Sequence, residues 1–128
     1  PFDEPGSKTP AFIQRAILQA IEDTAHNTGM VLTVAFDYGS RAELLRAAQR
    51  ARTKQQTAHS IDTGDISSNL YSPLIPPVDV VVRTSGESRI SNFLLWQIMG
   101  AKVYFTERTW PDFDAREIDN ALKLVHAR

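Results

Sequence analysis

The run from Val78 to Gln97, VDVVVRTSGESRISNFLLWQ, restricts the fold more than any other part of the chain. Residues 78 to 83 are rich in β-branched apolar side chains and predict a buried strand. Residues 91 to about 99 are apolar almost all round and predict a buried helix. A buried strand that leads through a short polar turn into a buried helix is typical of a parallel α/β sheet with right-handed crossovers.

The rest of the chain alternates between helical and strand patterns in the same way. Strands are predicted at Met30–Phe36 and Lys102–Phe105. Helices are predicted from Pro10 to about Asn27, from a Ser40/Glu43 capping box onward, near Ile66–Tyr71, and after a cap at Asp114 and Glu117. We therefore predict an α/β protein with a mainly parallel sheet flanked by helices. Residues 1–9 are expected to be a flexible lead-in, and residues 10–128 to be the C-terminal part of a single domain.

Composition excludes several classes of protein. Fourteen Lys and Arg against 15 Asp and Glu leave a net charge of −1, which gives no electrostatic reason to expect nucleic acid or an anionic membrane as the main partner. The absence of Cys excludes disulfides, thiolate metal sites and a Cys nucleophile. No GKS or GKT sequence is present, and glycine is too sparse for a dinucleotide-binding fingerprint. The histidines have no neighbours at metal-ligand spacing, so the pattern assigns no metal ligand.

Polar residues gather where the predicted strand at residues 78–83 ends. Arg83 lies at its carboxyl end, where ligands of parallel sheets bind. Arg89 and Ser91 lie where the next helix should begin, and free backbone N–H groups favour an anion there. Two guanidinium groups supply bidentate donors suited to a diphosphate, and Glu87 can hold one of them in place. Arginines at strand ends also form structural salt bridges, however, and serines cap helices, so the spacing alone leaves both interpretations open.

The segment RTSGESRISNFLLWQ, followed by YFTERTWPDF at residues 104–113, resembles the signature of the cis-prenyltransferases, the family of undecaprenyl and dehydrodolichyl diphosphate synthases. Residues 26–47 are similar to the stretch that precedes it in that family, and the resemblance extends over nearly the whole chain after about Pro10. It implies a prenyl-group transferase that condenses isopentenyl diphosphate onto an allylic diphosphate such as farnesyl diphosphate, using Mg²⁺. The expected product is undecaprenyl or dehydrodolichyl diphosphate.

The resemblance also assigns roles to individual residues. Arg83, Arg89 and Ser91 are expected to bind the diphosphate of isopentenyl diphosphate, and Glu87 to support that cluster. Met30 and Leu32 match a strand that lines the far end of a hydrophobic tunnel, so they are expected to influence product length.

Two departures from the family pattern limit this assignment. The family's Asp-Gly-Asn-Arg-type loop, which binds the allylic diphosphate and Mg²⁺, is absent from these residues, so the resemblance implies no catalytic residue in this chain. Bacterial members usually have Glu where this chain has Lys102, and a Lys cannot hold Mg²⁺. We therefore expect a C-terminal fragment that carries the isopentenyl diphosphate half-site and is inactive alone.

An alternative is a non-catalytic partner subunit of a heteromeric cis-prenyltransferase. Such subunits also lack the Asp loop, but they usually lose the Arg-Thr-Ser-Gly-Glu pattern that this chain keeps. The resemblance further implies a homodimer or a heteromeric complex and no nucleic-acid partner. It implies a cytoplasmic location with peripheral contact to a membrane, that of the endoplasmic reticulum if the protein is eukaryotic.

Overall fold

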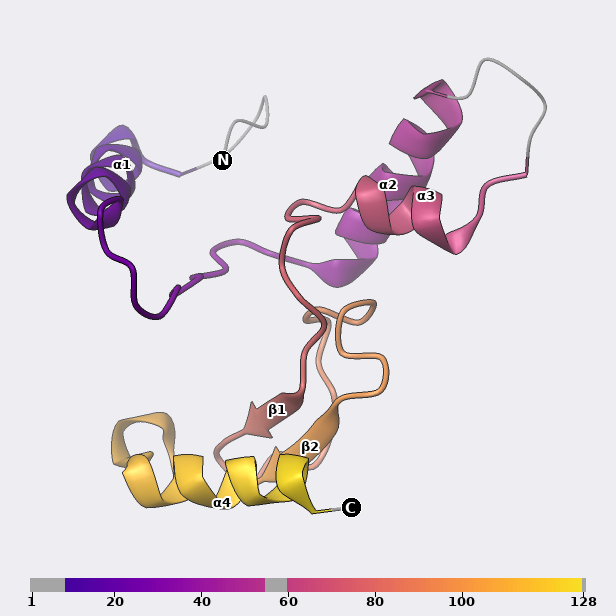
Figure 1. Cartoon of the computed structure of the whole chain (residues 1–128). Helices are drawn as coiled ribbons and strands as arrows, with labels where there is room; N and C mark the ends of the chain where they lie inside the picture. The colour runs from indigo at the N-terminus through magenta and orange to yellow at the C-terminus, as the bar shows by residue number, and fades with distance from the viewer. Residues whose placement is uncertain (1–8, 55–59, 128) are drawn as a thin grey trace. The chain divides into compact units, whose positions relative to one another are not determined.

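The computed structural model describes residues 9–54 and 60–127 (Figure 1). The chain divides into two compact units, Pro1–Val34 and Ala35–Arg128. Of the predicted lead-in at residues 1–9, all but Thr9 lies outside the described residues. No helix of the described part has the length and hydropathy of a membrane span.

The first unit contains α1 (Ala11–Thr24), which begins directly after Pro10. It ends three residues before the predicted boundary, because Ala25 already caps its last turn. The strand predicted at Met30–Phe36 is wrong, since this segment has an irregular backbone in the structure. A strand needs a hydrogen-bonded neighbour for its backbone groups, and no described hydrogen bond joins this segment to another strand.

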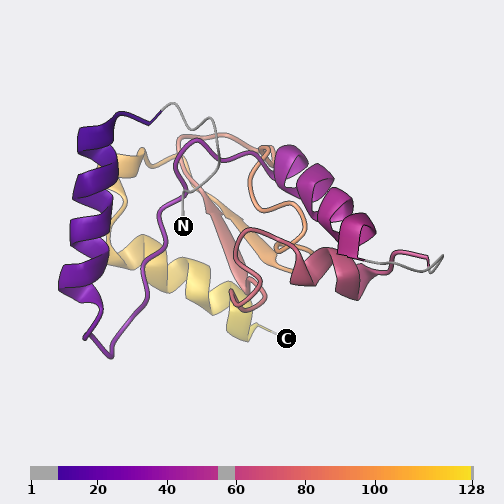
Figure 2. The ribbon, with the colours of Figure 1, turned by 90° about the horizontal axis from the view of Figure 1, so that it is seen from above.

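In the second unit, β1 (Val80–Arg83) and β2 (Lys102–Phe105) pair in parallel. Val80 lies opposite Lys102, and Arg83 lies opposite Phe105 at the carboxyl end. Helix α4 (Ala115–His126) packs against both strands, as Figure 2 shows. This arrangement confirms the predicted α/β class with a parallel sheet, and it places Arg83 at the sheet edge where the sequence predicted it.

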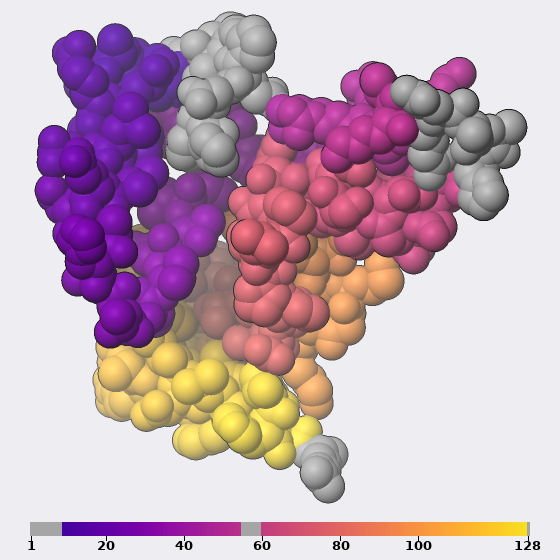
Figure 3. Space-filling model, turned by 45° about the horizontal axis from the view of Figure 1, so that its top comes forward, coloured from indigo at the N-terminus to yellow at the C-terminus, as the bar shows by residue number. Residues whose placement is uncertain are grey.

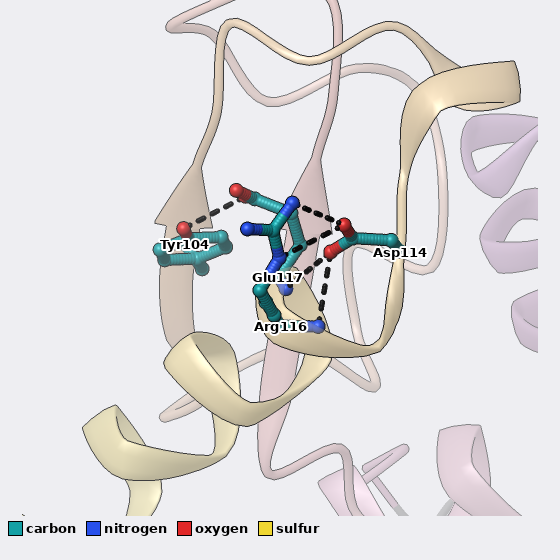
Figure 4. Close-up of polar contacts among 4 residues, drawn as sticks. All are labelled: Tyr104, Asp114, Arg116 and Glu117. Carbon is teal, nitrogen blue, oxygen red and sulfur yellow. Dashed lines mark hydrogen bonds and ion pairs between the residues drawn. The ribbon is translucent and has the colours of Figure 1, made fainter.

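The position of α4 is fixed by polar contacts at its start (Figure 4). The carboxylate of Asp114 accepts hydrogen bonds from the amides of Arg116 and Glu117 at 3.0 and 3.2 Å, so the predicted N-cap is confirmed. Glu117 instead accepts from the hydroxyl of Tyr104 on β2 at 2.9 Å. The Arg116 guanidinium, which contacts the same cap, lowers the pKa of Asp114. One end of α4 is therefore bound directly to the sheet.

Helices α2 (Ser40–Lys54) and α3 (Thr63–Ser68) lie side by side. The buried apolar residues here are Ala47, Ala51 and Leu70. A capping box does occur, but it lies at α3, between Asp62 and Asp65. The predicted capping box at Ser40 and Glu43 is wrong because both side chains are buried and bond to other segments. A short 3-10 helix, η1 (Trp110–Asp112), precedes α4.

The helix predicted from Ser91 to about Met99 is also wrong. Residues 92–100 form a series of turns, and Leu94 has a positive φ of 48°, a conformation that interrupts a right-handed helix. The backbone of this segment bonds to α2 instead. The Ser40 amide donates to the Asn92 carbonyl at 3.1 Å, and the Leu95 amide donates to the Ser40 hydroxyl at 2.9 Å. These tertiary hydrogen bonds join the segment to α2, while one helical bond remains within it, from the Ile98 amide to the Leu94 carbonyl at 3.0 Å.

Candidate functional site

The polar turn after β1 has a defined backbone conformation. Ser85 and Gly86 both have φ of 68°, and their amides donate to the carbonyls of Arg108 and Thr106 at 2.7 and 3.0 Å. A Cβ atom added to Gly86 would lie 2.5 Å from a carboxylate oxygen of Glu107. Glycine is favoured here because other residues disfavour positive φ, whereas the exposed Glu107 side chain could move away from an added Cβ atom. The segment after β2 thus fixes the turn.

Glu87 organises the two predicted anion-binding arginines. Its Oε2 atom lies 2.7 Å from Nε of Arg89 and 3.3 Å from Nη2 of Arg83. These two guanidinium groups, with the Arg89 hydrogen bond as the largest cause, lower the pKa of the Glu87 carboxyl. The sequence predicted that Glu87 could hold one arginine, and the structure shows it between both. The cluster keeps a net positive charge, with two cations around one carboxylate.

Several donors at this site have no acceptor. The Arg83 side chain is 33% exposed, yet its Nε atom is buried and has no partner among the described residues. An unpaired buried donor is costly in a native protein, and a ligand oxygen is one way to satisfy it. In the same part of the structure, the amides of residues 87–91 donate to no described acceptor. The predicted helix start is absent, but the free backbone donors expected from it are present.

Arg83, Arg89 and Ser91 line one pocket of about 260 Å³. The rest of its lining is apolar and comes from both strands and from the segment between them: Val78, Val80, Val81, Val82, Ile90, Phe93, Leu94, Ile98, Val103 and Phe105. The volume is close to the lower end of the range for small-molecule sites. The pocket therefore offers charged donors to an anionic group and an apolar surface to a short hydrocarbon.

This arrangement suits binding and charge neutralisation. Two guanidinium groups, a serine hydroxyl and free amides supply more donors than a single carboxylate can use, and they suit phosphate oxygens. The only carboxylate bonded to this cluster among the described residues, Glu87, accepts from both arginines, which favours its ionised form. Glu87 is therefore a positioning residue, and the pocket's chemistry is electrostatic.

A magnesium site does not fit the described residues. No group of three or more His, Asp or Glu side chains in the described ranges is arranged to hold an ion. Lys102 lies at the opposite end of the strand pair from Arg83, and its ammonium group donates to the carbonyl of Ala127 at 3.2 Å. Its position and charge do not suit a metal ligand.

The residues predicted to line a tunnel lie in the first unit. Met30 and Leu32 are 93% and 80% exposed, in the irregular segment after α1. Their side chains are open to solvent, so their effect on product length stays a prediction.

Sequence reasoning missed a second polar centre, at Glu43 on α2. This side chain is 2% exposed and accepts hydrogen bonds from the Tyr38 hydroxyl, the Tyr71 amide at 2.9 Å and the Gln97 amide group at 3.1 Å. Burial, followed by the Glu43 hydrogen bond, raises the pKa of Tyr38. Glu43 therefore joins three segments that are far apart in sequence. Nothing in its position as the fourth residue of a helix distinguishes it from an ordinary first-turn acid.

The chain matches the family model "Putative undecaprenyl diphosphate synthase" over residues 6–128. It is 43% identical over 122 residues to an isoprenyl transferase of Fusobacterium nucleatum, covering 95% of this chain and 52% of that protein. It is 45% identical over 109 residues to an isoprenyl transferase of Zymomonas mobilis, covering 82% of this chain and 44% of the relative. The chain thus spans about half the length of the curated relatives it matches.

Two solved structures share the fold at 31% identity over 95% of this chain. One is a probable undecaprenyl diphosphate synthase from Campylobacter jejuni, with a TM-score of 0.80 and 56% of that chain covered. The other is lavandulyl diphosphate synthase from Lavandula x intermedia in complex with dimethylallyl diphosphate, with a TM-score of 0.85 and 54% covered.

Proposed function

The chain belongs to the undecaprenyl diphosphate synthase family of prenyltransferases, and on that premise we propose that it carries the isopentenyl diphosphate half-site of a cis-prenyltransferase. The complete protein condenses isopentenyl diphosphate onto an allylic diphosphate, with undecaprenyl or dehydrodolichyl diphosphate as the product class. The observation that carries this proposal is that Arg83, Arg89 and Ser91 line the same pocket as a set of apolar side chains. An anionic head with a short hydrocarbon tail matches both parts of that pocket.

In this proposal each residue of the cluster has a distinct role. The guanidinium groups of Arg83 and Arg89 neutralise the diphosphate, and the Ser91 hydroxyl and the free amides of residues 87–91 complete its hydrogen bonds. Glu87 fixes the separation of the two arginines before the ligand arrives, so less ordering is needed on binding. The apolar lining orients the isopentenyl double bond. The relative bound to dimethylallyl diphosphate supports a prenyl diphosphate as the class of ligand.

Catalysis requires groups outside the described residues. In the complete protein we assign Mg²⁺, the allylic diphosphate and their ligands to the Asp-containing loop that the family has upstream. When bound, the metal supplies charge neutralisation for the departing diphosphate. The described chain contributes positioning, which holds the isopentenyl group close to its reaction partner. We therefore expect the chain alone to form no polyprenyl product.

Radiolabelled isopentenyl diphosphate, supplied with farnesyl diphosphate and Mg²⁺, tests whether this chain binds the substrate while other residues supply catalysis. The complete protein should incorporate the label into polyprenyl product, and the 128-residue chain should bind the labelled substrate without forming product. Product from the chain alone would disprove the assignment of catalysis to other residues. A chain that binds inorganic pyrophosphate as tightly as isopentenyl diphosphate would show that the apolar lining does not recognise the isopentenyl group.

A further inference from the structure

Helix α2 has a charge distribution that the net charge of the chain conceals. It contains five of the 14 Lys and Arg residues but one of the 15 Asp and Glu residues, so its formal charge is +4 while the rest of the chain carries −5. The single acid is Glu43, which is buried, whereas the five bases occupy the rest of the helix: Arg41, Arg46, Arg50, Arg52 and Lys54. The exposed surface of α2, which we call the basic face, therefore carries five bases and no acid, together with the uncharged residues Ala42, Leu45, Gln49 and Thr53.

The contacts within the described structure do not explain why so many bases lie on one helix. In the described structure no ion pair involves Arg41, Arg50, Arg52 or Lys54, although Arg46 lies 4.9 Å from the centre of the Tyr71 ring. Arg46, Arg50 and Lys54 follow one another at intervals of four, and like charges at that spacing destabilise a helix. The helix dipole favours cations in the last turn, which accounts for Arg52 and Lys54 but opposes Arg41 in the first turn.

The basic face also has a shallow hollow and one exposed apolar side chain. Arg46, Gln49, Arg50, Thr53 and Lys54 line the hollow on one flank of the helix. Leu45, four residues after Arg41 on the other flank, is 63% exposed among the cations. In Figure 3 the C-terminal half of α2 lies at the surface of the molecule.

We propose that the basic face of α2 is a docking surface for a membrane containing anionic phospholipids. Four to eight Lys or Arg residues on an amphipathic helix are typical of such binding, and an exposed Leu adds apolar contact at the head-group level. The neighbouring α3 contains no basic residue and has Asp65 in its first turn, so the positive potential is confined to one helix. A plane of separate head groups matches this pattern better than a single-stranded nucleic acid, which is typically bound in a basic groove with stacking aromatics.

The docked helix is linked to the substrate pocket through hydrogen bonds. Ser40, the first residue of α2, bonds to Asn92 and Leu95, and this segment contributes Phe93 and Leu94 to the pocket lining. Outside α2, the second unit has seven Lys and Arg against ten Asp and Glu, and this charge of −3 is repelled by an anionic surface, which favours an orientation with α2 toward the lipid. Membrane binding suits a protein whose proposed product is a long hydrocarbon. The docking surface is inferred from the charge of α2, however, and its test is separate from that of the proposed function.

Flotation of the 128-residue chain with vesicles measures this directly. We expect binding to vesicles that contain phosphatidylglycerol, weak binding to pure phosphatidylcholine, and loss of binding near 1 M salt, where the screening length is about 3 Å. Arg50→Gln/Lys54→Gln should lower partitioning about 25-fold, since each base near an anionic surface contributes about five-fold. The control Arg15→Gln/Lys123→Gln removes the same charge from exposed positions on α1 and α4 and should bind as the unmodified chain does.

Four results would overturn the proposal. They are equal binding to both vesicle types, no binding to either, equal loss in the two double variants, and preferential binding of a single-stranded oligonucleotide that displaces the chain from anionic vesicles. Circular dichroism and isopentenyl diphosphate binding of each variant establish that fold and pocket are intact. Because vesicle binding and diphosphate binding are measured separately, the failure of one is distinguishable from the failure of the other.

Discussion

Replacing the buried Glu43 should destabilise the second unit strongly. Its carboxylate accepts from the Tyr38 hydroxyl, the Tyr71 amide and the Gln97 side chain. Glu43→Ala removes both carboxylate oxygens and leaves these three donors without their acceptor. A buried donor left without its acceptor costs about 1–3 kcal/mol, so the loss for the two amide donors is worth about 2–6 kcal/mol in the free energy of unfolding. That is a large part of the about 5–15 kcal/mol that holds a typical domain together.

Urea denaturation followed by circular dichroism measures this change. Glu43→Gln keeps one acceptor oxygen and should cost about 1–2 kcal/mol, less than Glu43→Ala. Asp119→Asn is the matched control, because Asp119 is exposed on α4 and should change stability by no more than about 0.5 kcal/mol. If the free energy of unfolding of Glu43→Ala lies within about 0.5 kcal/mol of that of the unmodified chain, Glu43 does not hold the three segments together.

Three further perturbations test other parts of the structure. Burial raises the pKa of Tyr38, and the Glu117 hydrogen bond raises the pKa of Tyr104, so both phenols stay protonated above the ordinary value of 10.0. Their stabilising effect is complete below pH 10 and is lost as the pH rises through the pKa values of the folded state. Absorbance at 295 nm should show two tyrosines that ionise above pH 10, one of which disappears in Tyr38→Phe. Ionisation of both tyrosines at pH 10 would contradict this. Gly86→Ala should destabilise the turn by about 1–3 kcal/mol through its positive φ. Gly29→Ala, with no atom within 4 Å and no positive φ, should be tolerated. Equal melting temperatures of the two variants would refute the constraint at Gly86. Asp114→Ala should cost about 1 kcal/mol by removing the N-cap of α4, and an unchanged melting temperature would show that the cap is dispensable.

The elements that were predicted correctly are those with strong local signals. Val80–Arg83 and Lys102–Phe105 are β-branched or aromatic runs that pair with each other, and Asp114 precedes an amphipathic helix. The similar run at Met30–Phe36 forms no strand, because short-range sequence does not reveal whether a partner strand is present. The apolar pattern at residues 91–99 predicts a helix, because a hydrophobic pattern does not reveal competition for backbone hydrogen-bonding groups. Ser40, far away in sequence, takes those groups, and Leu94 leaves the helical conformation.

The candidate site was predicted in its residues but not in its geometry. Arg83, Arg89 and Ser91 line one pocket as expected, while the donors near them are free turn amides where a helix start was predicted. Glu43 and the basic face of α2 were missed for a shared reason. Whether a charged residue joins segments of the fold or faces a partner depends on its burial. Neither the spacing of Glu43 nor the net charge of the chain reveals burial.

Calorimetric titration of the chain with isopentenyl diphosphate tests the central claim most directly. Arg83→Ala removes a charge-assisted contact worth about 1.5–3 kcal/mol, so the dissociation constant should rise about 10- to 150-fold. Arg15→Ala, an exposed arginine on α1, should leave the constant unchanged. An unchanged affinity of a folded Arg83→Ala variant would contradict the assignment of this pocket to the diphosphate.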